Sequence, residues 1–144
     1  MSDEAKKTRW EHFPHQADVG IRGLGSTREQ AFEQAAVALT AVITSPEKVE
    51  PEQKVQISCS GIDSELLLVD WLNGLLYEMA TRKMLFSRFE VRIERNNLNA
   101  AAWGQKMDVS KHCPVVEVKA ATYTALSVRQ DENGTWIAQC IVDV

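Results

Sequence analysis

The sequence predicts an α+β domain in which two main helices pack on one face of a mixed, mostly antiparallel sheet. Two long segments repeat apolar residues at helical spacing, and five or six shorter segments alternate as half-buried strands do. Two strand pairs are joined by short turns containing Asn, which is typical of antiparallel hairpins. Because 144 residues suffice for one full core, we expect a flexible N-terminal tail over residues 1–9 and a single domain over residues 10–144.

The first strand and the first helix are expected close together. Residues 19–23 alternate and run into glycines, as a short strand does at its end. Ser26 and Glu29 then have the spacing of a capping box. Apolar residues recur every three or four positions from Phe32 until Pro46 stops the pattern, which predicts an amphipathic helix.

A second strand leads into the longest predicted helix. Residues 54–59 alternate cleanly, and Asp63 and Ser64 are suited to cap the helix that follows. From Glu65 to about Arg82 the apolar face is too broad for a helix that exposes one whole side. This helix is therefore expected to be the central packing element.

The second half of the chain is predicted to be mainly strand. Alternating segments are found at residues 89–94, at 98–103, from 116 toward Val128, and at 136–144. Asn96-Asn97 and Asn133-Gly134 are suited to the tight turns of two hairpins.

Composition narrows the class of protein. The net charge is −4, with 16 Lys and Arg against 20 Asp and Glu, so a basic face for strong direct nucleic-acid binding is not expected. Cys59, Cys113 and Cys140 are an odd number of cysteines without a Cys-x-x-Cys pair, which argues against a disulfide framework or a structural zinc site. No signal-peptide core and no membrane-length apolar run is found, so a cytoplasmic protein without membrane contact is expected.

One acid stands out at the end of the last predicted strand. Asp143 lies in the apolar segment 136–144, next to Val144 with its main-chain carboxylate. A carboxylate among apolar neighbours must be paired, hydrogen-bonded, protonated or bound to a metal. The residues alone leave two interpretations open: an oxygen-ligand cation site, or a strand end in solvent where Asp143 is an ordinary polar residue.

His15, Asp18 and Asp70 are further candidates with two interpretations each. His15 and Asp18 are three residues apart, which suits either a shared site or a local hydrogen bond. Asp70 lies within the apolar run of the long helix. It belongs either on an exposed stripe of that helix or, if buried, beside a hydrogen-bonding partner.

Lys111-His112 in a predicted loop and Lys119 on a predicted strand complete the polar candidates. A lysine on a strand is usually a solvated or edge-protecting residue. Cys113 is a lone thiol that we expect to be inert. No Ser-His-Asp elbow, zinc spacing or phosphate-binding glycine loop is present, so no local motif announces a reaction.

Six segments, taken in order, resemble the archease family, and together they cover nearly the whole chain from about Trp10. The matching segments are residues 15–21 with the helix that follows Ser26, 68–73 with 75–78, 85–87, Lys111-His112, 117–123, and the terminal Asp143 before an aliphatic residue.

The resemblance implies an accessory protein of tRNA splicing that is not itself an enzyme. Archeases activate RtcB-type RNA ligases by promoting their guanylylation and multiple turnover. It further implies a divalent cation, calcium or magnesium, held by Asp18, Asp143 and Val144; hard oxygen ligands suit these ions. The remaining candidates would be partner-facing or supporting residues, namely His15, Asp70, Lys111, His112 and Lys119.

The chain departs from the family pattern at two places. Many members have His after the Thr-Tyr of the late strand, where this chain has Thr124, so no role is carried to that position. The segment 111–116 also lacks a glycine that the pattern leads us to expect. The shape of that loop is therefore not predicted.

Two other functions compete with ligase activation. A chaperone or modulator of a tRNA methyltransferase would use an exposed surface and need no metal. A stand-alone metal-dependent hydrolase would be built around His15, Asp18 and Asp143, but no general base or pocket motif accompanies them.

Overall fold

The computed structural model describes residues 8–144, and residues 1–7 of the predicted tail lie outside the described residues. The elements are β1 (Arg9–His15), β2 (Asp18–Gly25), α2 (Arg28–Ile43), a 3₁₀ turn (Pro46–Lys48), β3 (Gln53–Ser60), α3 (Ser64–Arg82), β4 (Met84–Glu94), β5 (Asn97–Lys106), α4 (Val109–His112), β6 (Ala120–Ala121), β7 (Ser127–Gln130) and β8 (Trp136–Asp143). No helix among residues 8–144 is long and apolar enough to cross a membrane.

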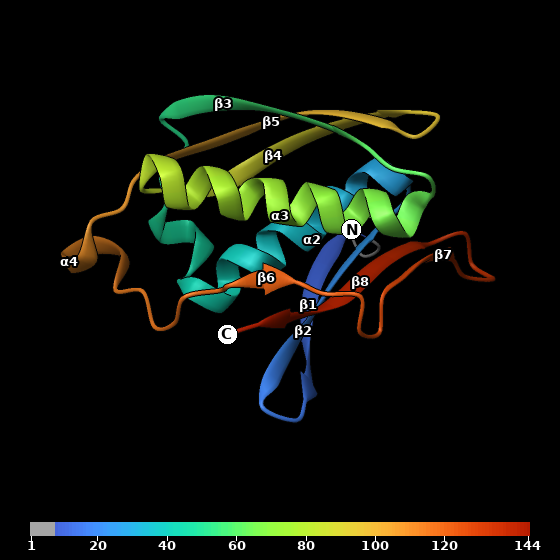
Figure 1. Ribbon diagram of the computed structural model, residues 1–144, viewed down its shortest axis with the longest axis horizontal. Coiled ribbons are helices and arrows are strands. Elements are labelled where there is room, and N and C mark those ends of the chain that lie inside the picture. The colour runs from blue at the N-terminus through green and yellow to red at the C-terminus, as the bar shows by residue number, and fades with distance from the viewer. Residues whose placement is uncertain (1–7) are drawn as a thin grey trace.

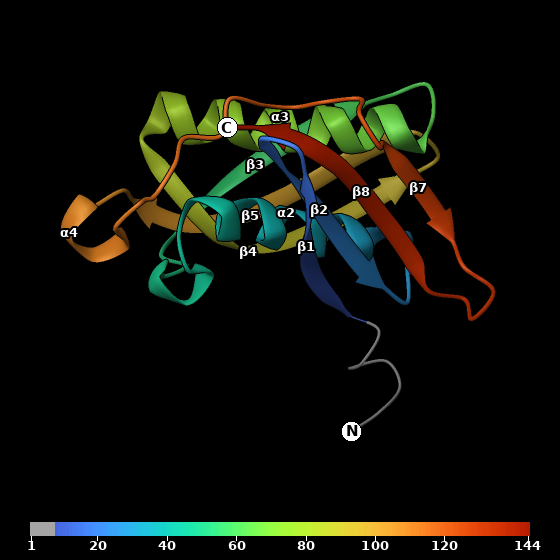
Figure 2. The same cartoon turned by 90° about the horizontal axis from the view of Figure 1, so that it is seen from below.

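The strands form two antiparallel sheets with the two long helices between them (Figures 1 and 2). One sheet has the order β1-β2-β8-β6, with β7 also paired to β8, and the other has the order β3-β5-β4. Helix α2 packs on β2 and β4, and α3 packs on β3 and β6. The α+β class is confirmed, and the helices cover one face of each of two sheets instead of one face of a single sheet.

The broad apolar face of α3 explains this three-layer arrangement. Its buried residues surround most of the helix and contact both layers; they are Leu67, Leu68, Val69, Trp71, Leu72, Leu75 and Met79. Trp71 is fully buried, and its indole N–H donates to the carbonyl oxygen of Phe32 on α2, 3.0 Å away. Since a buried indole N–H needs an acceptor, this bond joins the two helices in a fixed register.

The helix ends follow capping rules, with one change from the sequence prediction. Thr27, not Ser26, caps α2, because its side chain accepts from the backbone N–H of Gln30 at 3.1 Å. Asp63 caps α3 as expected, accepting from Leu66 N at 2.9 Å. Helix α3 ends at Lys83, which has the left-handed conformation of many helix ends.

The first strand, β1, was not predicted. Its inward and outward residues do not alternate between apolar and polar, because it is an edge strand whose partner on one side is β2 and whose other side is open. Arg9 begins this strand, paired with Leu24. The hairpin register ends with His15 paired to Asp18.

The predicted strand from 116 toward Val128 is mostly wrong. Only Ala120 and Ala121 pair there, with Asp143 and Val142 of β8, and β7 starts later at Ser127. The reason is that β8, the partner of β6, ends at Asp143 opposite Ala120, so the residues before Ala120 have no strand to pair with. Lys111-His112 belongs to the short helix α4 and not to a loop.

Candidate functional site

Asp18 and Asp143 are brought to the same end of one sheet by the register of β2 and β8. Val19 pairs with Val142, so Asp18 and Asp143 follow as the next residue in each strand. Residues directly opposite one another in an antiparallel pair point to the same face, with Cβ atoms about 4.5–5.5 Å apart. Two acids that are distant in the chain thus share one strand end, beside Val144.

The two acids lie on the face of the sheet that points away from the helices. Ile21, Cys140 and Val142 are packed in the core, and side chains alternate between the two faces along each strand. Asp18 is therefore directed outward and is half-buried, whereas Asp143 is exposed. An outward pair at a strand end can be approached by a partner.

His15 belongs to the same row, because it is paired with Asp18 across the β1–β2 hairpin. Its Nδ1 is buried and has no hydrogen-bond partner within residues 8–144. A buried polar atom without a partner is uncommon and marks a place where a ligand can bind. His15 and Asp18 are therefore neighbours across the hairpin, without a hydrogen bond between them that satisfies Nδ1.

The neighbouring residues on the same face of the sheet pack against one another next to the acids. A side chain at Gly20 would have its Cβ only 2.3 Å from the ring of Phe13, so the ring occupies the space that the glycine leaves. The Arg22 guanidinium lies over that ring at 4.5 Å from its centroid. It also donates to Glu11 at 2.7 Å and to Gln139 at 2.9 Å, so three neighbouring strands are joined behind the site.

Asp143 is also held from its other side. Its backbone carbonyl accepts from the backbone N–H of Lys119 at 2.8 Å, and it is paired with Ala120 of β6. Lys119 is exposed and thus places an ammonium group on the chain segment that borders the two acids. This strand end therefore carries the carboxylates of Asp18, Asp143 and Val144, and the exposed Lys119 lies on the segment beside it.

The donor set fits a hard cation. Within residues 8–144, no group of three or more His, Cys, Asp and Glu side chains is placed to hold a metal ion. Asp18 and Asp143 would therefore need the main-chain carboxylate of Val144 and ligands from water or a partner. Carboxylate oxygens with an incomplete protein shell suit magnesium or calcium and do not suit zinc, which is usually held by His and Cys in structural sites.

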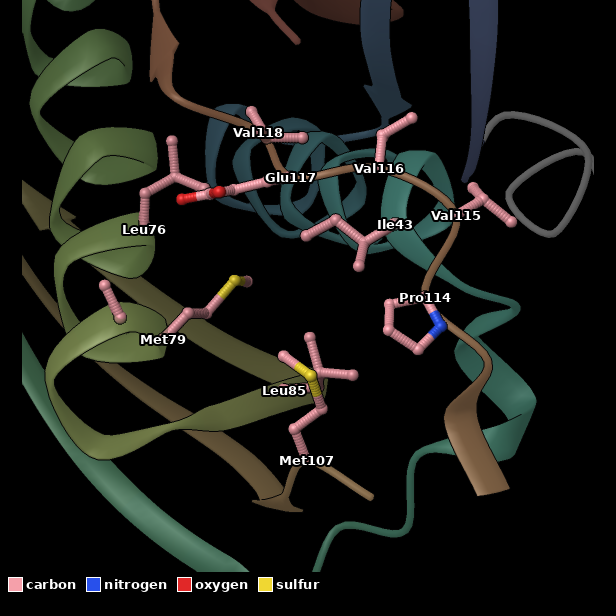
Figure 3. A pocket seen from close by; sticks show the side chains of 11 residues that line it. Ile43, Leu76, Met79, Leu85, Met107, Pro114, Val115, Val116, Glu117 and Val118 are labelled. Atoms are coloured by element: carbon pink, nitrogen blue, oxygen red, sulfur yellow. The ribbon is translucent and has the colours of Figure 1, made fainter. Parts of the chain in front are cut away.

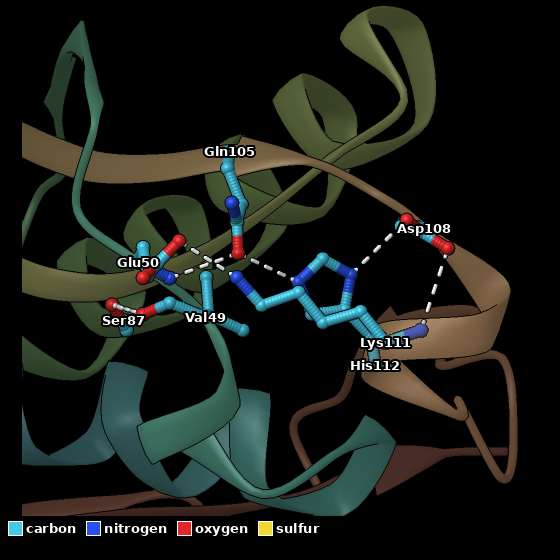
Figure 4. A network of polar contacts seen from close by, with 7 residues as sticks. All are labelled: Val49, Glu50, Ser87, Gln105, Asp108, Lys111 and His112. Atoms are coloured by element: carbon cyan, nitrogen blue, oxygen red, sulfur yellow. Dashed lines mark hydrogen bonds and ion pairs between the residues drawn. The ribbon is translucent and has the colours of Figure 1, made fainter.

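The other predicted candidates lie apart from this row. Asp70 is exposed on α3, as the exposed-stripe interpretation requires. Lys111 forms an ion pair with Glu50 at 2.7 Å (Figure 4). This ion pair and the hydrogen bond within it lower the pKa of the Glu50 carboxyl.

His112 is completely buried and is a structural residue (Figure 4). Its Nδ1 accepts from the backbone N–H of Asp108 at 2.9 Å, so its Nε2 carries the proton and donates to Gln105 Oε1 at 2.8 Å. Its carbonyl oxygen accepts from the Thr44 hydroxyl. With both ring nitrogens satisfied, His112 supports the α4 segment and does not face a partner.

Within segment 111–116, which lacks the expected glycine, Cys113 has a backbone conformation that suits glycine. This residue ends α4 in the left-handed conformation, with φ of 46°. Glycine is the usual residue at such a position, and here a cysteine occupies it.

Thr124, where many family members have His, is bonded to β8 through its backbone. Its carbonyl oxygen accepts from the backbone N–H of Ile141 at 3.0 Å.

Comparisons with known proteins identify the family. The family model described as Archease protein family (MTH1598/TM1083) matches residues 10–144. Protein archease of Pyrococcus abyssi is 41% identical over 140 residues, which cover 94% of this chain and 99% of the relative. The chain belongs to the archease family. Protein archease of Methanosarcina barkeri is 36% identical over the full length of both chains.

Two solved structures share the archease fold. The solution structure of Methanobacterium thermoautotrophicum protein 1598 is 32% identical, has a TM-score of 0.81, and covers 94% of this chain and 98% of that chain. The crystal structure of a Thermotoga maritima protein described as an archease, possible chaperone, is 17% identical, with a TM-score of 0.57 and coverage of 93% and 96%. The resemblance inferred from the sequence is confirmed for family and fold.

Sequence reasoning missed the residues that pack beside the two acids and hold the neighbouring strands together. Phe13, Arg22 and Gln139 lie in strands, and nothing in their local pattern indicates that they meet. Asn73 lies in a segment that resembles the family, but its side chain was given no role. The available signal was a polar residue within the apolar run of a packing helix, because the amide of the half-buried Asn73 needs hydrogen-bond partners.

Proposed function

We propose that this archease activates an RtcB-type tRNA-splicing RNA ligase by promoting its guanylylation and multiple turnover. The observation that carries the proposal is the placement of Asp18 and Asp143 at one strand end, beside Val144 and directed away from the core. Family membership supports the choice of partner. The protein would act as an accessory factor and would not itself join RNA.

The proposed mechanism uses the protein's own outward oxygens. Asp18, Asp143 and the Val144 carboxylate would hold a divalent cation, which when bound neutralises phosphate charge and orients phosphate oxygens. The carboxylates would present their remaining oxygens to the ligase's nucleotide site. Lys119, held beside Asp143 by its backbone N–H, would add a positive group that can contact a phosphate.

The charge of the protein is consistent with this role. With a net charge of −4, it would be attracted to a basic RNA enzyme and would not compete strongly for the RNA itself. Association should therefore weaken as salt is added, since the charges on both surfaces are screened.

A chaperone or modulator of a tRNA methyltransferase is the second candidate. The description of the Thermotoga maritima relative as a possible chaperone favours it. Such a role would use an exposed surface without a cation. Removal of the two acids distinguishes the candidates, because only ligase activation requires them.

The deciding experiment is multiple-turnover RNA ligation by a cognate RtcB-type ligase, together with formation of its guanylate adduct. The intact protein is expected to accelerate both, and Asp143→Asn is expected to abolish the acceleration. Glu132→Gln is the matched control, because Glu132 is an exposed acid in the turn at the other end of β8. Activation that survives Asp143→Asn would refute the cation mechanism, and no activation by the intact protein would favour the methyltransferase candidate.

A further inference from the structure

An apolar pocket lies between α3 and the segment 114–118, apart from the acids. Its volume is about 470 Å³, which lies within the range of ordinary binding pockets. Figure 3 shows Met79, Leu85 and Met107 on one side of the cavity, opposite Ile43 and the chain around Val116. All but one of its lining residues are apolar; they are Ile43, Leu76, Met79, Ala80, Leu85, Met107, Pro114, Val115, Val116 and Val118, with Glu117 as the exception.

The floor of the pocket is core and its rim is open. Leu85 and Met79 are buried, whereas Val115 is 75% exposed, Met107 41% and Val116 39%. An exposed apolar rim around an apolar depression is typical of a surface that a partner protein covers. A small ligand within the cavity would leave this rim in water, so the surface favours a larger occupant.

The outer wall of the pocket is adaptable. Within the described residues, the backbone between Pro114 and Lys119 is tied down by two hydrogen bonds, from Val115 N to Ile43 O at 2.9 Å and from Lys119 N to Asp143 O at 2.8 Å. The methionines at positions 79 and 107 add flexible side chains that can fit different apolar groups. The wall can therefore adjust to a side chain inserted beside it.

Glu117 gives the pocket a charge preference. Its side chain lies at the rim, between Leu76 and Val118 in Figure 3. Within residues 8–144 its carboxylate has no hydrogen-bond or ion-pair partner. Two basic residues next to the lining are engaged elsewhere, since Arg82 is paired with Glu78 and Lys106 donates to Arg82 O. The exposed Lys119, which follows Val118, is held to Asp143 only through its backbone N–H.

We propose that this pocket docks a basic amphipathic helix of a partner protein, with apolar side chains in the cavity and a Lys or Arg facing Glu117. Helices of this kind insert side chains from one face into apolar grooves, and the unpaired carboxylate selects a positive flank. The segment 114–118, which lines the pocket, is followed by Lys119, whose backbone N–H donates to the carbonyl oxygen of Asp143. The docked helix would therefore lie next to the acidic strand end. The proposal holds whichever protein supplies the helix.

Two synthetic helical peptides test the proposal by titration into the isotopically labelled full chain. One repeats Leu and Lys at helical spacing, and the other has Glu in place of every Lys. The Leu/Lys peptide is expected to bind with shifts centred on Leu76, Met107 and Val116, and the Leu/Glu peptide to bind at least about tenfold more weakly, because like charges oppose each other. Glu117→Lys, at an exposed position, should reverse this preference without altering the fold.

The controls separate a specific site from general attraction to an acidic protein. Glu132→Lys makes the same charge change at a distant turn and should leave the preference intact. Shifts outside the pocket, or an unchanged preference in Glu117→Lys, would overturn the proposal. Binding of dodecyltrimethylammonium at the pocket without binding of the Leu/Lys peptide would also overturn it and would indicate a small-ligand site.

Discussion

The side-chain amide of Asn73 hydrogen-bonds both backbone groups of Ala121. Its Oδ1 accepts from Ala121 N at 2.9 Å, and its Nδ2 donates to Ala121 O at 3.4 Å. A helix side chain thereby takes the place that a neighbouring strand would occupy at the edge of β6. Because β6 pairs with Asp143 on its other side, Asn73 helps to hold the acidic strand end.

Replacement of Asn73 should therefore weaken both the fold and the site. Asn73→Leu leaves two backbone groups without partners, which should lower the free energy of unfolding by about 1–3 kcal/mol. Asn73→Asp keeps the acceptor for Ala121 N and loses the donor to Ala121 O. It should therefore lower the free energy of unfolding by a comparable or smaller amount. Denaturant unfolding measures both, with Asn97→Asp, an exposed change in β5, as the control. Full stability of Asn73→Leu would show that these bonds do not hold β6.

The left-handed Cys113 predicts a stabilising substitution. Non-glycine residues in this conformation carry a steric penalty of about 1–2 kcal/mol. Glycine avoids this penalty, but its greater conformational freedom in the unfolded chain offsets part of the gain in stability. Cys113→Gly should therefore raise the free energy of unfolding by about 0.5–1 kcal/mol. Ser110→Gly, within α4 itself, should lower it by a similar amount. Equal effects of the two changes would contradict the assigned conformation.

The three cysteines should differ sharply in reactivity. Burial raises the pKa of the Cys140 thiol to about 12 and that of Cys59 to about 11, with the Asp70 charge adding to the latter. Since the thiolate is the reactive form, neither should react readily at pH 8. Cys113, which the sequence led us to expect to be inert, is instead exposed. Ellman's reagent should therefore modify one thiol per folded chain, and none in Cys113→Ser. Rapid reaction of two or more thiols with the reagent would contradict the burial of Cys59 or Cys140.

The sequence predicted the elements better than their contacts. Both long helices and most strands follow from local periodicity, because burial on one side repeats at the spacing of the element. The failure at 116–119 has a nonlocal cause: Ala120 is paired with Asp143, the last residue of β8, so the alternating residues before Ala120 have no strand residue opposite them. Asp18 and Asp143 were joined only through a family resemblance, since the β2–β8 register is a long-range pairing that no local pattern encodes.

Glu33 predicts a pH dependence of stability. This half-buried acid on α2 accepts from Val91 N of the edge strand β4 at 2.8 Å. Its pKa is raised, mainly because burial desolvates the carboxylate; the bond from Val91 opposes the shift, and the charges of Glu90 and Glu29 add to it. The folded state therefore holds the proton more tightly than the unfolded state, so Glu33 supports folding most at low pH.

This contribution should be fully present below the ordinary glutamate pKa of about 4.5 and lost as pH rises through the raised value. Glu33→Gln keeps an acceptor for Val91 N and carries no charge. It should match the parent at low pH and exceed it in melting temperature at pH 7. Glu94→Gln, at an exposed position on the same strand β4 as Val91, should change stability by no more than about 0.5 kcal/mol. Thermal unfolding between pH 4 and 7 decides the matter: a Glu33→Gln protein that is less stable than the parent at pH 7 would mean that the hydrogen bond from Val91 to the ionised carboxylate outweighs the desolvation of Glu33.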